Sequence, residues 1–265
     1  MKKILTMAAV ALLAASCSND KDVITPDLGT ANAPVAIKLT QSVEGLTTKA
    51  PITNGSQVEG IVVMVDVTSG HEHDWGSFNP VYKNEINETT KALETRANVA
   101  GAVFTAGTET DITLTPTLYY DNAQASPKSS HITAVVPSGT IESSKVVFGK
   151  VDGLQDVMTI GADQDAGTAA SPNQNGCKLT FAHKTTQLVF AASYTSVADN
   201  KGEWAGKDVS IKSIKVLGTQ LPQSVNLTNG DVNWATASDF SVPNITTTTL
   251  STTASTISPA VMVAP

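Results

Sequence analysis

Short apolar stretches with a two-residue period recur along most of this chain, and they limit the folds that it can adopt. Residues 61–65 (IVVMV) form a β-branched run that is typical of a strand covered on both faces. Ile132, Ala134 and Val136 lie two residues apart, as do Leu179 and Phe181, which is the period of a strand. Asn229-Gly230 separates two further runs of this kind and predicts a tight hairpin. The sequence therefore predicts an all-β protein.

The order of the predicted strands indicates two domains. A stretch rich in Gly, Asp, Asn and Pro covers residues 161–176, and we interpret it as a linker or domain boundary. We expect two tandem antiparallel Greek-key β-sandwich domains, over residues 35–165 and 174–265. One helix is predicted over residues 86–97, with Asn87 as its cap. Residues 258–265 begin a last strand, which we expect to be unusually short or truncated.

The N-terminus has the features of a secretory signal peptide. Lys2 and Lys3 precede a largely apolar stretch over residues 4–15, which is too short to cross about 30 Å of hydrocarbon. Residues 13–17 (LAASC) resemble the lipobox of bacterial lipoproteins. The resemblance implies a lipoprotein signal peptide over residues 1–16, acylation of Cys17 and a flexible tether over residues 17–34. The alternative is an ordinary signal peptide followed by a chance cysteine.

Composition argues against several classes of function. Charged residues make up 15% of the chain, the net charge is −7 and no basic patch is visible, so we expect no nucleic-acid partner. The sequence contains neither a Gly-x-Ser-x-Gly motif nor a Gly-rich phosphate-binding loop, so no enzyme class is supported and no cofactor is expected. With Cys17 acylated, Cys177 would have no partner for an internal disulfide.

Two polar clusters contain residue types that bind metal ions. His71 and His73 would share one face of an extended segment, and Asp74 could add an oxygen ligand. Asp163 and Asp165, with Asp152 and Asp156 nearby, could hold calcium through oxygens, although the fixed spacing of an EF-hand is absent. The first cluster lies in a Gly-rich loop and the second matches no motif, so we interpret both as solvated loops and assign no metal.

The remaining conspicuous side chains have structural interpretations. His183 ends an apolar strand and is predicted to make a structural hydrogen bond, while Cys177 is predicted to fill space at the start of that strand. Trp75, Trp204 and Trp234 are isolated from one another in the sequence. We therefore expect them to pack in cores or hairpins rather than to form a sugar-binding platform.

Several segments together resemble the fimbrillin family of Bacteroides-like bacteria, which builds type V pili. The strongest local match is residues 177–184 (CKLTFAHK), which run into residues 188–190 (LVF). Upstream, residues 132–137 and 152–158 resemble steps of the same family pattern. Downstream, the resemblance continues in residues 209–214 and 226–234, so that it covers about residues 35–265.

This resemblance implies a structural subunit of a fimbria, acting as shaft, anchor or tip and supporting adhesion. It implies a precursor anchored in the outer membrane, at the cell surface, which a trypsin-like protease cuts after a basic residue in the first loop. Here that position is Lys49-Ala50, whereas the family usually has Arg, so the protease would have to accept Lys. The alternative is that Lys49 is a loop lysine that is not processed.

The partners that the resemblance implies are other fimbrillin subunits, joined by donor-strand exchange, and a receptor on a host or bacterial surface. The alternative from another class is a surface lipoprotein that binds glycans for nutrient uptake. A cluster of exposed aromatic side chains would favour that alternative.

Overall fold

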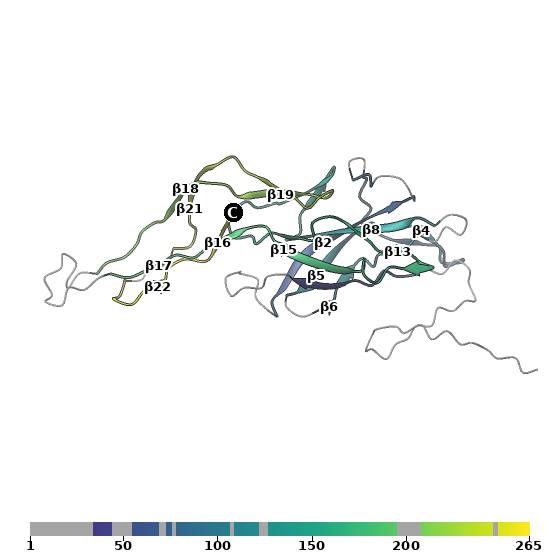
Figure 1. Cartoon of the computed structure of the whole chain (residues 1–265), viewed down its shortest axis with the longest axis horizontal. Helices are drawn as coiled ribbons and strands as arrows, with labels where there is room; N and C mark the ends of the chain where they lie inside the picture. Colours follow the sequence, from purple (N-terminus) through teal and green to yellow (C-terminus); the bar gives the residue numbers. More distant parts are fainter. Residues whose placement is uncertain are drawn as a thin grey trace, which may run out of the picture. The chain divides into compact units, whose positions relative to one another are not determined.

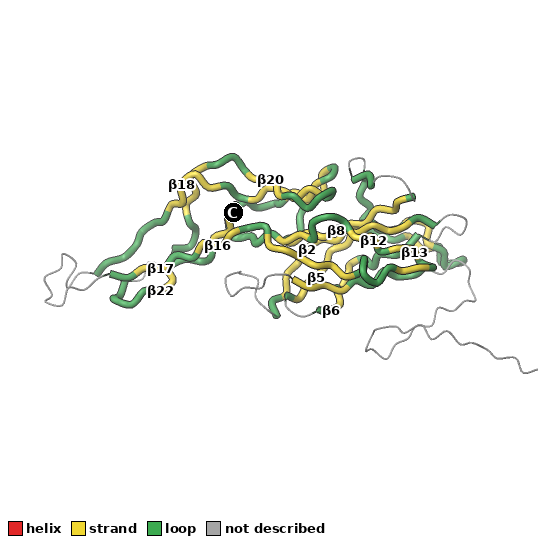
Figure 2. Tube along the Cα trace, viewed as in Figure 1, coloured by secondary structure: helices red, strands yellow, loops and turns green. Residues whose placement is uncertain are grey.

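The described part of the chain consists of strands and loops. The computed structural model describes residues 34–43, 55–68, 73–75, 78–106, 109–121, 127–194, 208–245 and 249–265. No helix occurs in these ranges, as Figure 2 shows. It follows that no described helix could cross a membrane. The prediction of an all-β protein is confirmed.

The largest sheet has nine strands, in the order β6-β1-β15-β11-β8-β2-β5-β7, with β12 also paired to β8. Its strands are β1 (Thr40–Val43), β2 (Gln57–Val67), β5 (Val99–Thr105), β6 (Thr110–Asp111), β7 (Thr113–Thr115), β8 (Ser129–Val136), β11 (Met158–Thr159), β12 (Gln164–Asp165) and β15 (Lys178–His183). Figure 1 labels several of them. The two ends of the order, β6 and β7, are separated in the chain by Ile112 alone, so the sheet curls until it is almost a barrel.

Strand β2 is covered on both faces, as its continuous apolar run predicted. Val62 and Met64 join a core that lies inside the curled sheet and includes Leu179 and Phe181 of β15. The alternate residues Ile61 and Val63 belong to a second core. A central strand that is buried on both sides cannot show hydrophobic-polar alternation, which explains its unbroken apolar sequence.

A four-stranded sheet contributes to the second core. Its order is β20-β19-β10-β9, with β9 (Thr140–Glu142), β10 (Lys145–Val147), β19 (Pro222–Asn226) and β20 (Val232–Trp234). The turn between β19 and β20 contains Asn229-Gly230, and Gly230 has a φ of 71°, which favours glycine. The hairpin predicted at this dipeptide is confirmed.

The C-terminal part is built from two-stranded ladders. They pair β16 (Thr186–Leu188) with β23 (Val261–Val263), β17 (Ala191–Ala192) with β22 (Ser255–Thr256), and β18 (Lys215–Thr219) with β21 (Ser238–Ser241). A third core contains residues of the β16–β23 and β18–β21 ladders, but only Val242, Val261 and Val263 in it are buried. Its seven other apolar residues are partly buried, namely Leu188, Phe190, Ile214, Val216, Leu221, Phe240 and Ile245. A smaller share of its apolar side chains is fully buried than in the other two cores.

The helix predicted over residues 86–97 is wrong. The segment is a hairpin of β3 (Glu85–Ile86) and β4 (Leu93–Thr95). The Asn87 side-chain oxygen accepts hydrogen bonds from the backbone N–H groups of Thr89 and Thr90, each at 3.0 Å, and Lys91 takes a positive φ of 56°. Asn87 therefore closes a turn instead of capping a helix. The segment also lacks an apolar stripe whose burial would stabilise a helix.

The stretch over residues 161–176, which we interpreted as a linker or domain boundary, contains three short strands. This stretch contains β12, which pairs with β8, and a small ladder of β13 (Gly167–Thr168) with β14 (Ser171–Pro172). The following strand, β15, was expected to open a second domain, but it lies in the large sheet. There it pairs with β1 in parallel, so the expectation of purely antiparallel sheets fails as well. The two tandem sandwiches are not confirmed.

Candidate functional site

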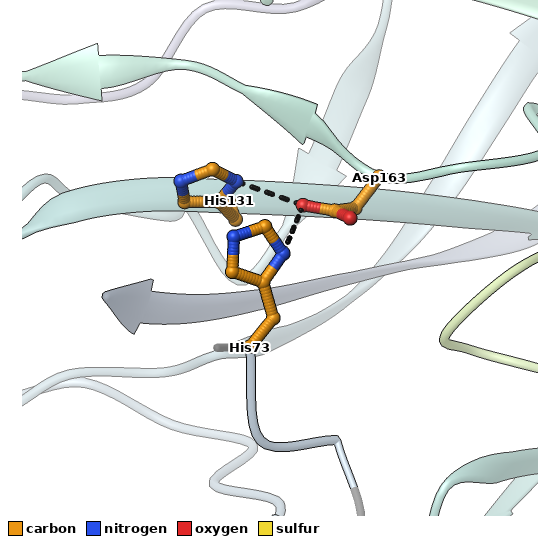
Figure 3. A group of neighbouring side chains, drawn as sticks. All are labelled: His73, His131 and Asp163. Atoms are coloured by element: carbon orange, nitrogen blue, oxygen red, sulfur yellow. Dashed lines mark hydrogen bonds and ion pairs between the residues drawn. The ribbon is translucent and has the colours of Figure 1, made fainter. Parts of the chain in front are cut away.

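Two histidine rings and one carboxylate meet beside the large sheet (Figure 3). The Nδ1 atoms of His73 and His131 lie 2.9 Å and 2.8 Å from the same oxygen, Oδ2 of Asp163. The two rings are in contact, with centroids 3.9 Å apart and planes tilted by 43°. The Asp163 side chain is 11% exposed, His131 14% and His73 30%. The cluster is thus shielded from solvent on the Asp163 side and more open at His73.

Three segments that are distant in the sequence position these side chains. His73 is two residues before Trp75, which is 1% exposed and packs in the second core, so the core fixes this loop segment. His131 is in β8, the long strand paired with β2. Asp163 immediately precedes β12, whose pairing with β8 places Asp165 opposite His131. The sheet register therefore brings Asp163 to the histidines.

A second carboxylate lies behind His131. Oδ1 of Asp165 is 3.8 Å from Nε2 of His131 and accepts hydrogen bonds from the Ser129 hydroxyl and from the Gly167 backbone N–H. Burial acts to raise the pKa of Asp165, but these hydrogen bonds and the neighbouring histidines outweigh it and hold the pKa below its ordinary value. Asp165 is therefore an ionised partner for the far nitrogen of His131.

The donor set is two imidazole nitrogens and one carboxylate oxygen, and their ligand atoms lie within 4.8 Å of one another. The sequence drew attention to His73 and to Asp163, but in two separate hypotheses. His131 was missed because it lies inside an apolar strand and has no neighbour in the sequence that suggests a ligand. Only the register of β8 with β12 connects the three residues.

His183 belongs to a second, structural network. Its Nδ1 lies 3.0 Å and 2.9 Å from the two carboxylate oxygens of Asp156, whose side chain is 2% exposed. The Thr185 hydroxyl donates to the same carboxylate at 2.9 Å. The prediction that His183 makes a structural hydrogen bond is confirmed, and Asp156 is held by it rather than presented to solvent.

Cys177 is buried and free, as predicted for a residue that fills space. Its sulfur lies 3.5 Å from the Tyr120 hydroxyl, which donates to the backbone oxygen of Ala166 at 3.2 Å. Burial raises the pKa of the thiol and also that of the Tyr120 hydroxyl. A buried neutral thiol is a poor nucleophile, so this pair has a structural role.

The described aromatic residues form no platform for sugars. Trp75 is buried against Phe78, with ring centroids 6.1 Å apart, and Trp234 is partly buried in β20. Among the large apolar side chains exposed in the described part, Tyr82, at 52% exposure, is the only aromatic one.

Several residues singled out from the sequence lie outside the described residues. They are the lipidation residue Cys17, the cleavage position Lys49-Ala50, His71 and Trp204. Their predicted roles stay predictions.

Comparisons with known proteins give a weak structural likeness. No protein-family model and no curated protein matches the chain. A solved structure that resembles it is that of a protein from Bacteroides uniformis described as a "putative cell adhesion protein". The two chains are 14% identical with a TM-score of 0.42, and the match covers 88% of this chain and 76% of the other. At this level the likeness establishes neither a family nor a function.

Proposed function

We propose that this protein is a lipid-anchored surface subunit that assembles by strand exchange into an adhesive fibre. Cys17 would carry the anchor in the outer membrane, and a cut between Lys49 and Ala50 would start assembly. The partners would be other subunits of the same kind and a receptor on a host or bacterial surface. The lipobox-like sequence at Cys17 supports the location, and the place of β1 in the sheet supports the mechanism.

The observation that carries the proposal is the position of β1 between β6 and β15. β1 pairs with β15 in parallel and with β6 in antiparallel. The segment that ends in β1 also supplies Ile37 and Leu39, which are 3% and 2% exposed, to the first core. Ile37, Leu39 and β1 all precede Lys49 in the chain. A cut after Lys49 would leave this segment held by non-covalent contacts alone.

Loss of this segment would expose two kinds of surface at once. The backbone groups of β6 and β15 that pair with β1 would lose their partners, and Leu179 and Phe181 would lose apolar neighbours. Burial of Ile37 and Leu39 contributes about 1.5–3 kcal/mol each. A strand from another subunit, with apolar side chains at alternate positions, would restore both the pairing and the burial. Because donor and acceptor surfaces differ, such contacts repeat into a filament.

The C-terminal ladder contains a segment suited to be the donor. Val261 and Val263 are two residues apart and buried, and β23 pairs with β16 alone among the described strands. The third core around them is mostly half-buried. Because β23 belongs to a two-stranded ladder, one strand pairing holds it, whereas a strand inside the large sheet is held by two. We therefore propose that β23 and its flanking residues take the place of β1 in the next subunit. We call this place, between β6 and β15, the slot of β1.

Limited digestion of the detergent-solubilised full chain with trypsin tests this function. The expected result is a ladder of polymers that resists detergent, filaments in electron micrographs, and subunits whose N-terminus is Ala50. Lys49→Gln should abolish the ladder, whereas Lys91→Gln, at an exposed lysine in the β3–β4 turn, should leave it unchanged.

A product that stays monomeric after complete cleavage at Lys49 would overturn the proposal. If that monomer is also retained on a polysaccharide column, the glycan-binding alternative would replace it. The same column run on the uncut protein separates retention by the fold from retention caused by cleavage.

A further inference from the structure

We propose that His73, His131 and Asp163 form a binding site for a divalent transition-metal ion, with Zn²⁺ as the best match. The site is independent of strand exchange, since it lies on β8, the segment before β12 and the loop of Trp75 rather than on β1.

The ligand atoms already converge on one point. Both Nδ1 atoms contact the same carboxylate oxygen, at 2.9 Å and 2.8 Å. Ligands around tetrahedral zinc lie about 2.0–2.1 Å from the metal, which separates them from one another by about 3.3 Å. Each Nδ1 therefore needs to move away from Oδ2 of Asp163 by only about half an ångström to accept the ion. Figure 3 shows both rings directed at Asp163, as this requires.

The chemistry of the donors selects the class of metal. Imidazole suits zinc, copper and nickel, whereas calcium and magnesium prefer sites made of oxygen alone. Two nitrogens and one oxygen leave a fourth tetrahedral position open, as in zinc sites that hold a water molecule or an outside ligand. His73, at 30% exposure, leaves the cluster accessible to an ion from solution.

Asp165 supplies the outer partner that metal-binding histidines usually have. A histidine that binds metal through Nδ1 carries its proton on Nε2 and donates it to a carboxylate, which fixes the orientation of the ring. Nε2 of His131 lies 3.8 Å from Oδ1 of Asp165, which is within ion-pair range but too long for a hydrogen bond, so the two groups would have to move closer when the ion binds. Asp165 is itself held by the Gly167 backbone N–H at 2.8 Å. Asp165 is thus a positioning residue that acts through His131.

Calorimetric titration of the chelator-treated, detergent-solubilised full chain with ZnCl₂ tests the site. One ion per chain is expected, together with a rise in Tm, because the ion would connect three segments distant in the sequence. Asp163→Asn and His131→Asn should weaken binding by more than about 100-fold, and Asp165→Asn by about 10-fold. Asp239→Asn, at an exposed carboxylate outside the cluster, should bind as the unchanged protein does.

A second measurement needs no variant. Bound Zn²⁺ should protect His73 and His131 from modification by diethylpyrocarbonate, as read by mass spectrometry against the same protein without zinc. The site is refuted if the unchanged protein binds no zinc, if Asp163→Asn binds as tightly as the unchanged protein while remaining folded, or if zinc protects His71 alone.

Discussion

At the scale of single residues, buried polar groups join distant segments through a few hydrogen bonds. Asp156 accepts from His183 and from Thr185, while its side chain is 2% exposed. A carboxyl group this well buried is tolerated because it has hydrogen-bond partners, and removing one member leaves the others without compensation. The step that resembles the fimbrillin pattern, Phe181 followed by His183, thus has a structural reason in this chain.

Replacing Asp156 with Ala should therefore lower the free energy of unfolding by about 3–5 kcal/mol. His183 and the Thr185 hydroxyl would lose their hydrogen-bond acceptor in a buried place. The cost of leaving them without a partner exceeds the net stabilisation that the intact interaction provides. Urea denaturation measures the loss. Asp239→Ala is the matched control, because Asp239 is 52% exposed and 3.9 Å from Lys215, and its loss should cost less than about 1 kcal/mol. Equal effects of the two changes would contradict this account.

The buried thiol gives a prediction about alkaline pH. Burial raises the pKa of Cys177, against the opposing effect of the Tyr120 hydroxyl. The folded state then favours the neutral thiol, so its contribution to stability is complete below the unfolded pKa of about 8.5 and is lost as pH rises above it. Cys177→Ala should therefore lose less unfolding free energy between about pH 7.5 and pH 10 than the unchanged protein. Urea unfolding at each pH measures this difference. If the unfolding free energies of the variant and of the unchanged protein fall equally over this pH range, the thiol has no such effect.

At the scale of elements, close packing between strands makes single glycines critical. A Cβ at Gly60 of β2 would lie 2.5 Å from a ring carbon of Phe104 and 2.6 Å from the backbone oxygen of Val135. Gly101, on the neighbouring strand β5, would place a Cβ 3.6 Å from its nearest neighbour, which is ordinary contact. The two glycines lie in paired strands but differ in the space around them.

Gly60→Ala should accordingly lower the unfolding free energy by about 1–3 kcal/mol, since the backbone oxygen and the buried ring cannot both move aside. Gly101→Ala is the matched control and should be neutral or slightly stabilising. The urea concentration at the midpoint of unfolding measures the effect of each variant, provided that the m-value does not change. A tolerated alanine at Gly60 would mean that β2 and β8 are not packed as described.

The elements also show what the sequence could and could not predict. Alternation and continuous apolar runs identified β2, β8 and β15, because burial in a sheet dictates those patterns. The segment over residues 161–176 was misread because polar side chains hold its short strands: Asp165 accepts from the Gly167 backbone N–H, and the Asn173 side chain donates to the Asp165 backbone oxygen at 2.8 Å. The cluster of His73, His131 and Asp163 depends on strand register, which no local pattern specifies.

At the scale of the whole molecule, the account depends on whether β1 can be replaced. Its slot in the large sheet is lined by backbone groups of β6 and β15 and by the first core. If cleavage after Lys49 empties this slot, any segment with the right alternation should compete for it. A peptide with the sequence of residues 35–43 (VAIKLTQSV) carries the native pattern.

The most direct measurement is therefore the amount of detergent-resistant polymer formed by the trypsin-cleaved protein as this peptide is added in increasing concentration. The account predicts that the peptide suppresses polymers in proportion to its concentration. A matched peptide with Ile37→Asp and Leu39→Asp should have no effect. Strand exchange at the slot of β1 would be contradicted if the amount of polymer did not change when the native peptide is added, or if the cleaved protein formed no polymer at all.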